Sequence, residues 1–346
     1  MMKKALPILS FLALLAGACT NPLEVRFDQA PEVLILNAML RTDDTVHFAL
    51  LNRGLTDDIQ PVPDARLRCF VNGALVSEGT LVPGMSTIYT SHFEFPARIQ
   101  PGDEVRLEAV DGSLQASATV KAPLAAPIVA VDTAHVQDSP YYTPEDFRCR
   151  LRLQDLQGQD NWFRLSVRTE KDRTDQLHRY DLRQQEAVNF GFMEDPILRD
   201  GYLRDSDKGN DIMQLFAGIS IPNAYCTFKD VPFADSSAEV EIHLKDPGNS
   251  VYAVDKSYDP ETQAFVSNRI TLTVSLRFTL LTITKEEYDY LTQLNRSLYS
   301  SLDLGPLEEP VHIPGNVEGG LGFVSVASAS TLVLTMPLKE GNPYIF

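Results

Sequence analysis

The chain has 346 residues with 47 acidic and 30 basic side chains, which gives a formal net charge of −17. Hydrophobic residues make up 44% of it, a share that fits a globular protein of about two domains and excludes disordered, collagen-like and coiled-coil classes. The acidic excess argues against nucleic acid as a partner, because there is no basic face to replace the counterions of the phosphates.

Residues 1–18 have the layout of a secretory signal, with two lysines, a short apolar run and small residues directly before Cys19. Small residues that end on a cysteine are typical of a lipoprotein signal, in which the thiol is acylated and becomes the first residue of the mature chain. Ala16 departs from that pattern, since leucine is more usual at this position. We therefore predict a palmitate-type lipid anchor on Cys19, followed by a tether over residues 19–30. The alternative is an ordinary cleaved signal in front of a chance cysteine.

The residue after Cys19 bears on location. Thr20 stands where an aspartate often retains such lipoproteins at the inner membrane, so we expect the outer membrane. Each buried CH2 group of an acyl chain contributes about 0.8 kcal/mol, and two or more chains hold a protein stably on a bilayer. Whether the body faces the periplasm or the exterior is left open.

Short apolar or alternating runs punctuated by turn residues predict an all-β, mainly antiparallel sandwich over residues 31–122. The runs at 33–40 and 45–51 are typical of a hairpin, and Asn72-Gly73 between two apolar arms is a strong hairpin signal. Strands of this length with closely spaced turns favour an immunoglobulin-like or transthyretin-like sandwich without a helix.

Alanine and proline at 123–127 predict a linker to a larger β-rich domain over 128–346, either a C-terminal sandwich or a barrel-like domain. The alternating runs at 147–155 and 161–170 predict another hairpin. The run at 269–283 is long enough to be a central or bent strand.

One helix is predicted at 284–302. Thr284 is a good N-cap, and Glu287 three residues later completes a capping box. Two further strands are expected around the glycine run at 319–322. This run is more typical of a bulge or a close strand crossing than of a phosphate cradle, because strand residues follow it and no helix starts there.

After acylation of Cys19, three cysteines remain, an odd number for an oxidising compartment. Cys149 and Cys226 fall in the same predicted domain and are the candidate disulfide. The alternative is that Cys69, Cys149 and Cys226 are three buried free thiols.

The candidate metal site is a calcium loop formed by Asp205, Asp207 and Asp211. Alternating oxygen-bearing side chains around a tight turn can direct several ligands to one hard cation. The loop departs from known calcium loops, because Gly209 takes a position that usually supplies a ligand. A solvated surface loop is the alternative, and we expect no other cofactor.

No enzyme is predicted. None of the six histidines lies in a zinc-binding pattern, and His47 and His243 are expected to be ordinary strand residues. There is no G-x-S-x-G elbow, although carboxylates for a glycosidase are plentiful. Five aromatic residues could line a carbohydrate or small-molecule cleft, with core packing as the favoured alternative: Tyr141, Tyr142, Trp162, Phe163 and Tyr180.

Several segments in a fixed order resemble the family named domain of unknown function 4249, lipoproteins of Bacteroidota. The two most specific are LLTITKEEYDYL at 280–291 and EEPVHIPGNVEGGLGFVSVAS at 308–328. Earlier ones include VLILNAML at 33–40, PVPDARLRCFVNG at 61–73 and LQDLQGQDNWFRLSV at 153–167.

The resemblance implies a two-part β-rich lipoprotein with no established enzymatic chemistry and no catalytic residues to assign. Members of the family are often encoded beside TonB-dependent outer-membrane receptors. We therefore expect a non-catalytic binding or accessory subunit of such a transporter. A structural or adhesive envelope protein is the alternative, and a hydrolase is the least favoured reading.

Overall fold

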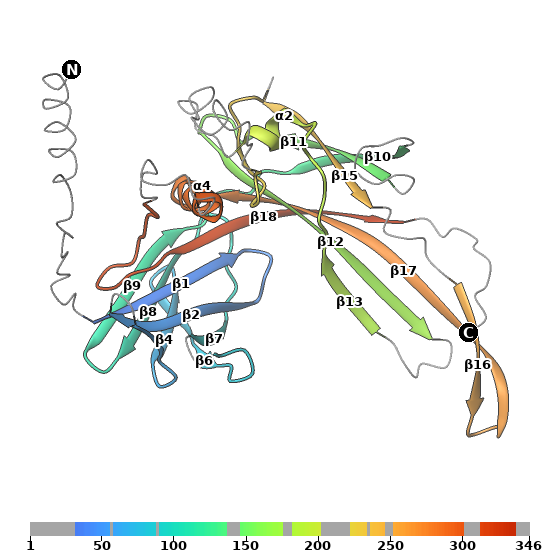
Figure 1. Cartoon of the computed structure of the whole chain (residues 1–346), viewed down its shortest axis with the longest axis horizontal. Coiled ribbons are helices and arrows are strands. Elements are labelled where there is room, and N and C mark those ends of the chain that lie inside the picture. Colours follow the sequence, from blue (N-terminus) through green and yellow to red (C-terminus); the bar gives the residue numbers. More distant parts are fainter. Residues whose placement is uncertain are drawn as a thin grey trace, which may run out of the picture.

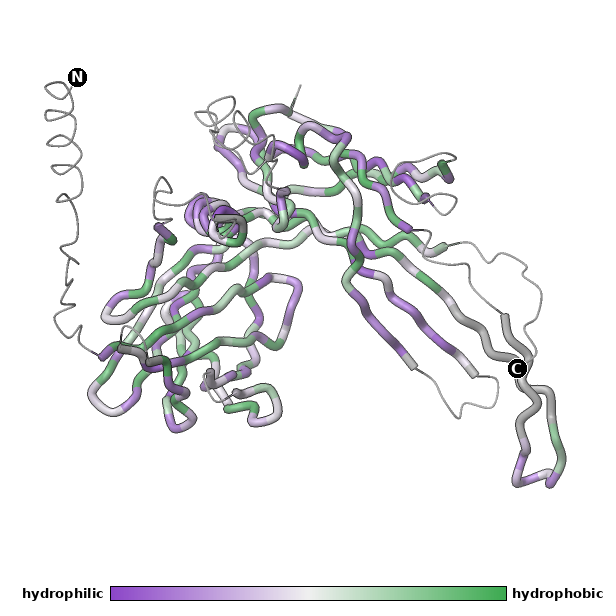
Figure 2. Tube along the Cα trace, viewed as in Figure 1, coloured by the Kyte–Doolittle hydropathy of each residue, from purple (hydrophilic) through white to green (hydrophobic). Residues whose placement is uncertain are grey.

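The computed structural model describes residues 32–55, 58–87, 90–136, 146–175, 182–201, 222–233, 236–245, 252–300 and 312–336. In these residues the protein is almost entirely β, with three sheets and two helices (Figure 1). The strand pairings are antiparallel apart from one between named strands, so the predicted all-β class is confirmed. Hydrophobic and hydrophilic residues alternate along many of these strands (Figure 2).

The N-terminal sandwich packs part of an 11-stranded sheet against a four-stranded sheet. From its own half of the chain, the larger sheet receives β1 (Val33–Arg41), β2 (Val46–Leu55), β3 (Asp58–Pro61), β6 (Thr80–Leu81) and β7 (Ser91–Pro96). The smaller sheet contains β4 (Arg66–Val71), β5 (Ala74–Glu78), β8 (Glu104–Asp111) and β9 (Leu114–Lys121). Alternate residues of β1, such as Leu34 and Leu36, are fully buried against Leu67 and Leu107 from the opposite sheet.

Both hairpins predicted in this sandwich are confirmed. Strands β1 and β2 pair antiparallel, with Leu36 opposite Leu51. The turn between β4 and β5 has φ angles of 50° at Asn72 and 79° at Gly73, and two positive φ angles are what a type I′ turn requires.

The C-terminal sandwich has a three-stranded sheet of β10 (Ile128–Val136), β11 (Asp146–Gln154) and β15 (Ser237–Lys245). The other part of the 11-stranded sheet contains β12 (Trp162–Asp175), β13 (Leu182–Ala187), β14 (Thr227–Lys229), β16 (Tyr252–Asp259), β17 (Ala264–Ile283) and β18 (Val324–Thr335). Residues of β12, β14, β17 and β18 pack against the three-stranded sheet. Strand β17 pairs with β12, β16 and β18, which confirms the predicted central strand.

The hairpin predicted from 147–155 and 161–170 is wrong. Strand β11 pairs with β10 and β15, whereas β12 pairs with strands of the other sheet. Leu151 of β11 and Phe163 of β12 belong to the same core, so the two strands face each other across it. Their alternating patterns mark one buried face on each strand, which a facing pair satisfies as well as a hairpin does.

Strand β18 is shared by the two sandwiches. Its first residues lie parallel to the end of β1, with Ala38 opposite Val324, and its later residues pair antiparallel with β17. Val324 and Val326 are buried in the N-terminal core. The C-terminal end of the chain therefore completes a sandwich that the sequence analysis placed wholly within 31–122. Among the described residues after the helix there is one strand, not the two predicted.

The predicted helix is α4 (Lys285–Ser300), and Thr284 Oγ1 accepts a hydrogen bond from the Glu287 amide at 3.2 Å. This confirms the N-cap. A short helix that the sequence analysis missed, α2 (Pro196–Asp200), is capped by Asp195, whose Oδ1 accepts from the Leu198 amide at 2.9 Å. Neither helix has the length and apolar character needed to cross a membrane, within the part of the chain that the structure describes.

Candidate functional site

Residues 312–322, here called the crossing loop, connect the two sheets of the N-terminal sandwich. On one side the Leu36 amide donates to Leu321 O and the Leu321 amide to Leu34 O, both at 2.9 Å. On the other side Glu318 exchanges two backbone hydrogen bonds with Ser117 of β9, at 2.7 and 2.9 Å. The loop is thus fixed to both sheets by its backbone.

Glycine is required where the crossing loop passes over β1. Gly322 has a φ of +116°, and a Cβ there would lie 2.1 Å from the Leu36 carbonyl oxygen. A Cβ on Gly320 would lie 2.4 Å from the Leu34 oxygen. Only a residue without a side chain can approach so closely. The predicted close strand crossing is therefore confirmed.

A cleft of about 520 Å³ lies beside the crossing loop, within the range of about 300–1,000 Å³ that is usual for ligand pockets. Helix α4 contributes Tyr290, whose ring stacks on Phe323 with centroids 4.1 Å apart and planes 7° from parallel. The half-buried position of Tyr290 raises the pKa of its hydroxyl. The lining is made of Ile35, Asn37, Tyr290, His312, Ile313, Pro314, Gly315, Val317, Gly320, Leu321 and Gly322.

A smaller and more charged hollow of about 310 Å³ is bordered by residues 318 and 319 of the same loop. Arg68 and Arg106 line it, and both form ion pairs with Glu108, at 2.8 and 2.7 Å. The crossing loop thus contributes to two hollows, one largely apolar and one charged.

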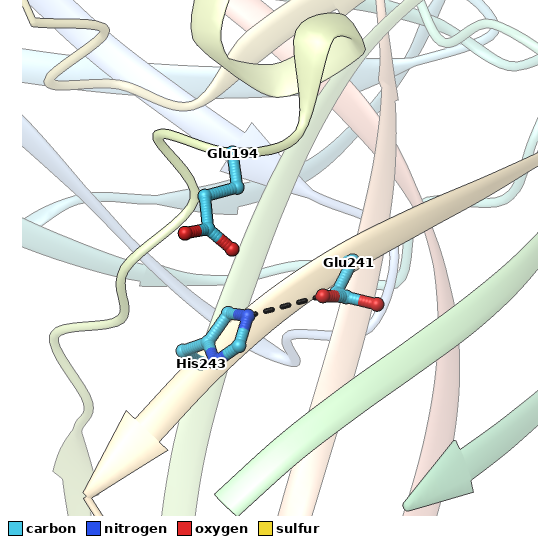
Figure 3. Close-up of side chains that lie close together, drawn as sticks. All are labelled: Glu194, Glu241 and His243. Carbon is cyan, nitrogen blue, oxygen red and sulfur yellow. Dashed lines mark hydrogen bonds and ion pairs between the residues drawn. The ribbon is translucent and has the colours of Figure 1, made fainter. Parts of the chain in front are cut away.

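A second group of polar residues lies in the C-terminal sandwich. Glu194, Glu241 and His243 each offer a ligand atom, and these atoms lie within 4.8 Å of one another (Figure 3). They are the group of described residues whose types and spacing could hold a metal ion. The sequence analysis treated His243 as an ordinary strand residue. The signal it passed over is the repeat of polar residues at every second position of β15, which puts Glu241 and His243 on one face.

Several predicted site residues lie outside the described part of the chain: Cys19, Asp205, Asp207, Asp211, Tyr141, Tyr142 and Tyr180. The two remaining aromatic candidates lie in different surroundings. Phe163 is fully buried and stacks on Phe233, with ring centroids 5.6 Å apart. Trp162 instead packs against the cluster formed by the start of α4.

The disulfide predicted between Cys149 and Cys226 is not formed. Both residues, like Cys69, are free and buried thiols, which is the alternative that the sequence analysis left open. Cys149 and Cys226 lie in the same apolar core as Leu151 and Phe228. Burial raises the thiol pKa of each to about 12, so each behaves as a small apolar side chain.

The fold and the cleft define a protein of two β-sandwiches that share a C-terminal strand, with a glycine-rich loop crossing one of them. The family model described as "Domain of unknown function (DUF4249)" matches residues 20–332, and the chain belongs to this family. Helix α4, the crossing loop and most of β18 all lie within the matched range.

The chain has distant likenesses to solved structures. β-Glucuronidase 3 from Bacteroides uniformis is 9% identical with a TM-score of 0.20, over 74% of this chain and 25% of the enzyme. A putative membrane anchored protein from Corynebacterium diphtheriae is 6% identical with a TM-score of 0.19, over 91% of this chain and 61% of that protein. The chain thus spans about a quarter of the length of the glucuronidase, and neither likeness bears on function. No curated protein matches the sequence.

Proposed function

We propose that the protein is an outer-membrane lipoprotein, anchored through an acylated Cys19, that binds a small molecule without converting it. In this proposal it serves as an accessory subunit of a TonB-dependent transporter. The observation that carries the binding role is the cleft between the crossing loop and α4. The alternative is a structural or adhesive envelope protein that has no ligand.

The composition of the cleft supports recognition. Ile313 and Leu321 are 39% and 59% exposed, so the cleft presents apolar surface to a ligand. Tyr290 adds an aromatic ring, and Asn37 and the loop backbone add polar groups. Apolar walls with a few polar groups are typical of sites that bind small molecules.

The rigidity of the crossing loop supports the same role. Hydrogen bonds to β1 and β9 hold it in place, and its close approach to β1 requires glycine at positions 320 and 322. A preformed site loses little conformational entropy when its ligand binds, which favours affinity.

The family match supports the anchor, because the matched region begins at residue 20, directly after Cys19. A mature lipoprotein would begin at this cysteine. The anchor is tested by labelling cells with radioactive palmitate. We expect the label on the wild-type protein and its loss in Cys19→Ser, and an unlabelled wild-type protein would refute the anchor.

Partner and ligand are tested on the full chain, purified in mild detergent from membranes of the organism that encodes it. We expect a β-barrel receptor in stoichiometric amount and, by native mass spectrometry, a bound small molecule. Leu321→Glu should remove the small molecule. Val129→Glu, at a residue on β10 that is 53% exposed, is the control and should retain it. Absence of both receptor and bound molecule from the wild-type protein would favour the structural alternative.

A further inference from the structure

Strand β15 places two metal-ligating side chains side by side. Val240, Ile242 and Leu244 are fully buried in the C-terminal core, so the alternate residues Glu241 and His243 face away from it. His243 Nε2 lies 3.1 Å from Glu241 Oε1 (Figure 3). The imidazole is nevertheless only 4% exposed, because another segment covers it.

That segment is 191–195, and it is hydrogen-bonded to β15 on both sides of Glu194. Gly191 and His243 exchange two backbone hydrogen bonds of 2.8 Å. Asp195 Oδ2 accepts a 2.7 Å hydrogen bond from the Glu241 amide. Glu194 is therefore held beside the strand by the fold, and its carboxylate points toward the histidine (Figure 3).

A second layer of side chains orients these groups. Asp146, with no exposed surface, accepts a hydrogen bond from His243 Nδ1 at 3.0 Å. Arg150 Nε donates to Glu241 Oε2 at 2.6 Å, which leaves Oε1 directed at the imidazole. A carboxylate on the outer nitrogen of a histidine fixes the tautomer and makes the inner nitrogen a better ligand, an arrangement usual at metal sites.

We propose that Glu194, Glu241 and His243 form a binding site for a divalent transition-metal ion of the zinc class, a site that goes beyond the proposed binding role of the cleft. One imidazole nitrogen with two carboxylate oxygens suits Zn²⁺, whereas Ca²⁺ and Mg²⁺ prefer oxygen ligands alone. Ligands about 2.0–2.1 Å from a tetrahedral zinc ion are roughly 3.3 Å apart. The 3.1 Å separation of Nε2 and Oε1 is already close to this value.

Asp146 accepts from Nδ1, so Nε2 is the imidazole nitrogen that faces the carboxylates of the proposed site. Three protein ligands leave a fourth position for water.

Isothermal titration of the chelator-treated full chain in detergent tests the site, with ZnCl₂, CaCl₂ and MgCl₂ as the probes. We expect one equivalent of Zn²⁺ to bind, and far weaker binding of Ca²⁺ and Mg²⁺. Glu194→Gln and His243→Gln should each lower the zinc affinity by a factor of ten or more. Glu239→Gln is the matched control. It lies on the same face of β15, is exposed and pairs with Arg152 at 3.0 Å, so it should bind zinc as the wild type does.

A further readout separates ligation from a purely structural role. Cobalt should give the absorption of a tetrahedral site in the wild type and in Glu239→Gln. If His243→Gln fails to fold, Glu194→Gln decides, because its side chain is exposed. Absence of zinc binding to the wild type, equal binding to Glu194→Gln, or equal affinity for calcium would overturn the proposal.

Discussion

Replacing Glu287 with glutamine should remove a pH-dependent loss of stability. Glu287 lies in the first turn of α4 and is 2% exposed, and its Oε2 has no hydrogen-bond partner among the described residues. Burial raises the pKa of this carboxyl from 4.5 to about 7, while the Ser325 hydroxyl and the Arg164 charge lower it by less. The sequence analysis assigned Glu287 to a capping box, and the structure places its carboxyl beside Ser325 of β18.

The direction and the size of this stability change follow from the pKa of Glu287 in the unfolded and in the folded protein. In the unfolded chain the proton is lost near pH 4.5, but the folded protein keeps it until about pH 7. The stabilising effect of the retained proton is complete below pH 4.5 and is lost as the pH rises to about 7. Each pKa unit corresponds to about 1.4 kcal/mol, so about 2–3 kcal/mol should be lost between pH 5 and pH 8.

Urea unfolding at pH 5 and pH 8 measures this loss. Trp162 is the chain's single tryptophan and packs against the cluster at the start of α4, so its fluorescence reports on this region. Glu287→Gln should gain about 2–3 kcal/mol over the wild type between the two pH values. Glu286→Gln, at the exposed neighbouring position of the same turn, should follow the wild type at both. An equal free-energy difference for Glu287→Gln at both pH values would refute the reasoning.

Three further outcomes are expected. Gly322→Ala should destabilise the protein by at least about 2 kcal/mol in urea unfolding, because a Cβ there meets the Leu36 oxygen. Gly84→Ala should be near neutral, because no atom of the described residues lies within 4 Å of a Cβ at that position. A thiol reagent should react slowly with the folded protein, because burial raises the pKa of Cys69 to about 11 and those of Cys149 and Cys226 to about 12. In urea the same reagent should react with all three buried thiols. Rapid labelling of the folded protein would contradict their burial. Asn223→Ala should lower the free energy of unfolding in urea by about 2–4 kcal/mol. The side-chain amide of the buried Asn223 donates to Leu198 O at 2.7 Å and to Thr227 O at 2.8 Å, and its oxygen accepts from the Thr227 amide at 3.1 Å. A loss below 0.5 kcal/mol would contradict that reasoning.

Local features of the fold could be predicted from the sequence because their causes are local. The alternation on β1, the Asn72-Gly73 turn and the Thr284 cap each depend on a few neighbouring residues. Pairing between distant strands has no such signal. Periodicity shows which face of β18 is buried, but not that Val324 lies opposite Ala38.

The same distinction explains the metal-ligating group. The alternation of β15 predicts that Glu241 and His243 share a face. Glu194 joins them only because Gly191 pairs with His243, and Asp146 only because β11 lies beside β15. Two of the four groups could therefore be placed on one strand from the sequence, while the other two depend on contacts between segments far apart in the chain.

The segment predicted as a linker also has a structural role that its composition does not show. Its Ala126 amide donates to Thr282 Oγ1 at 2.9 Å, and Ser328 Oγ donates to the Pro123 carbonyl oxygen. Strands β17 and β18 therefore hold residues 123–127 in place, and the segment is not a free hinge.

The cleft depends on this connection between the sandwiches. The crossing loop belongs to the N-terminal sandwich, whereas Tyr290 comes from α4, which follows β17 of the C-terminal sandwich. Strand β18 starts directly after Phe323, the residue that Tyr290 stacks on, and then pairs with β17. One continuous strand, β18, therefore positions both walls of the cleft, the crossing loop and α4. A ligand of the cleft would bind only when the two sandwiches are folded together. The family match is consistent with this dependence, because it runs from residue 20 to 332 and includes both walls.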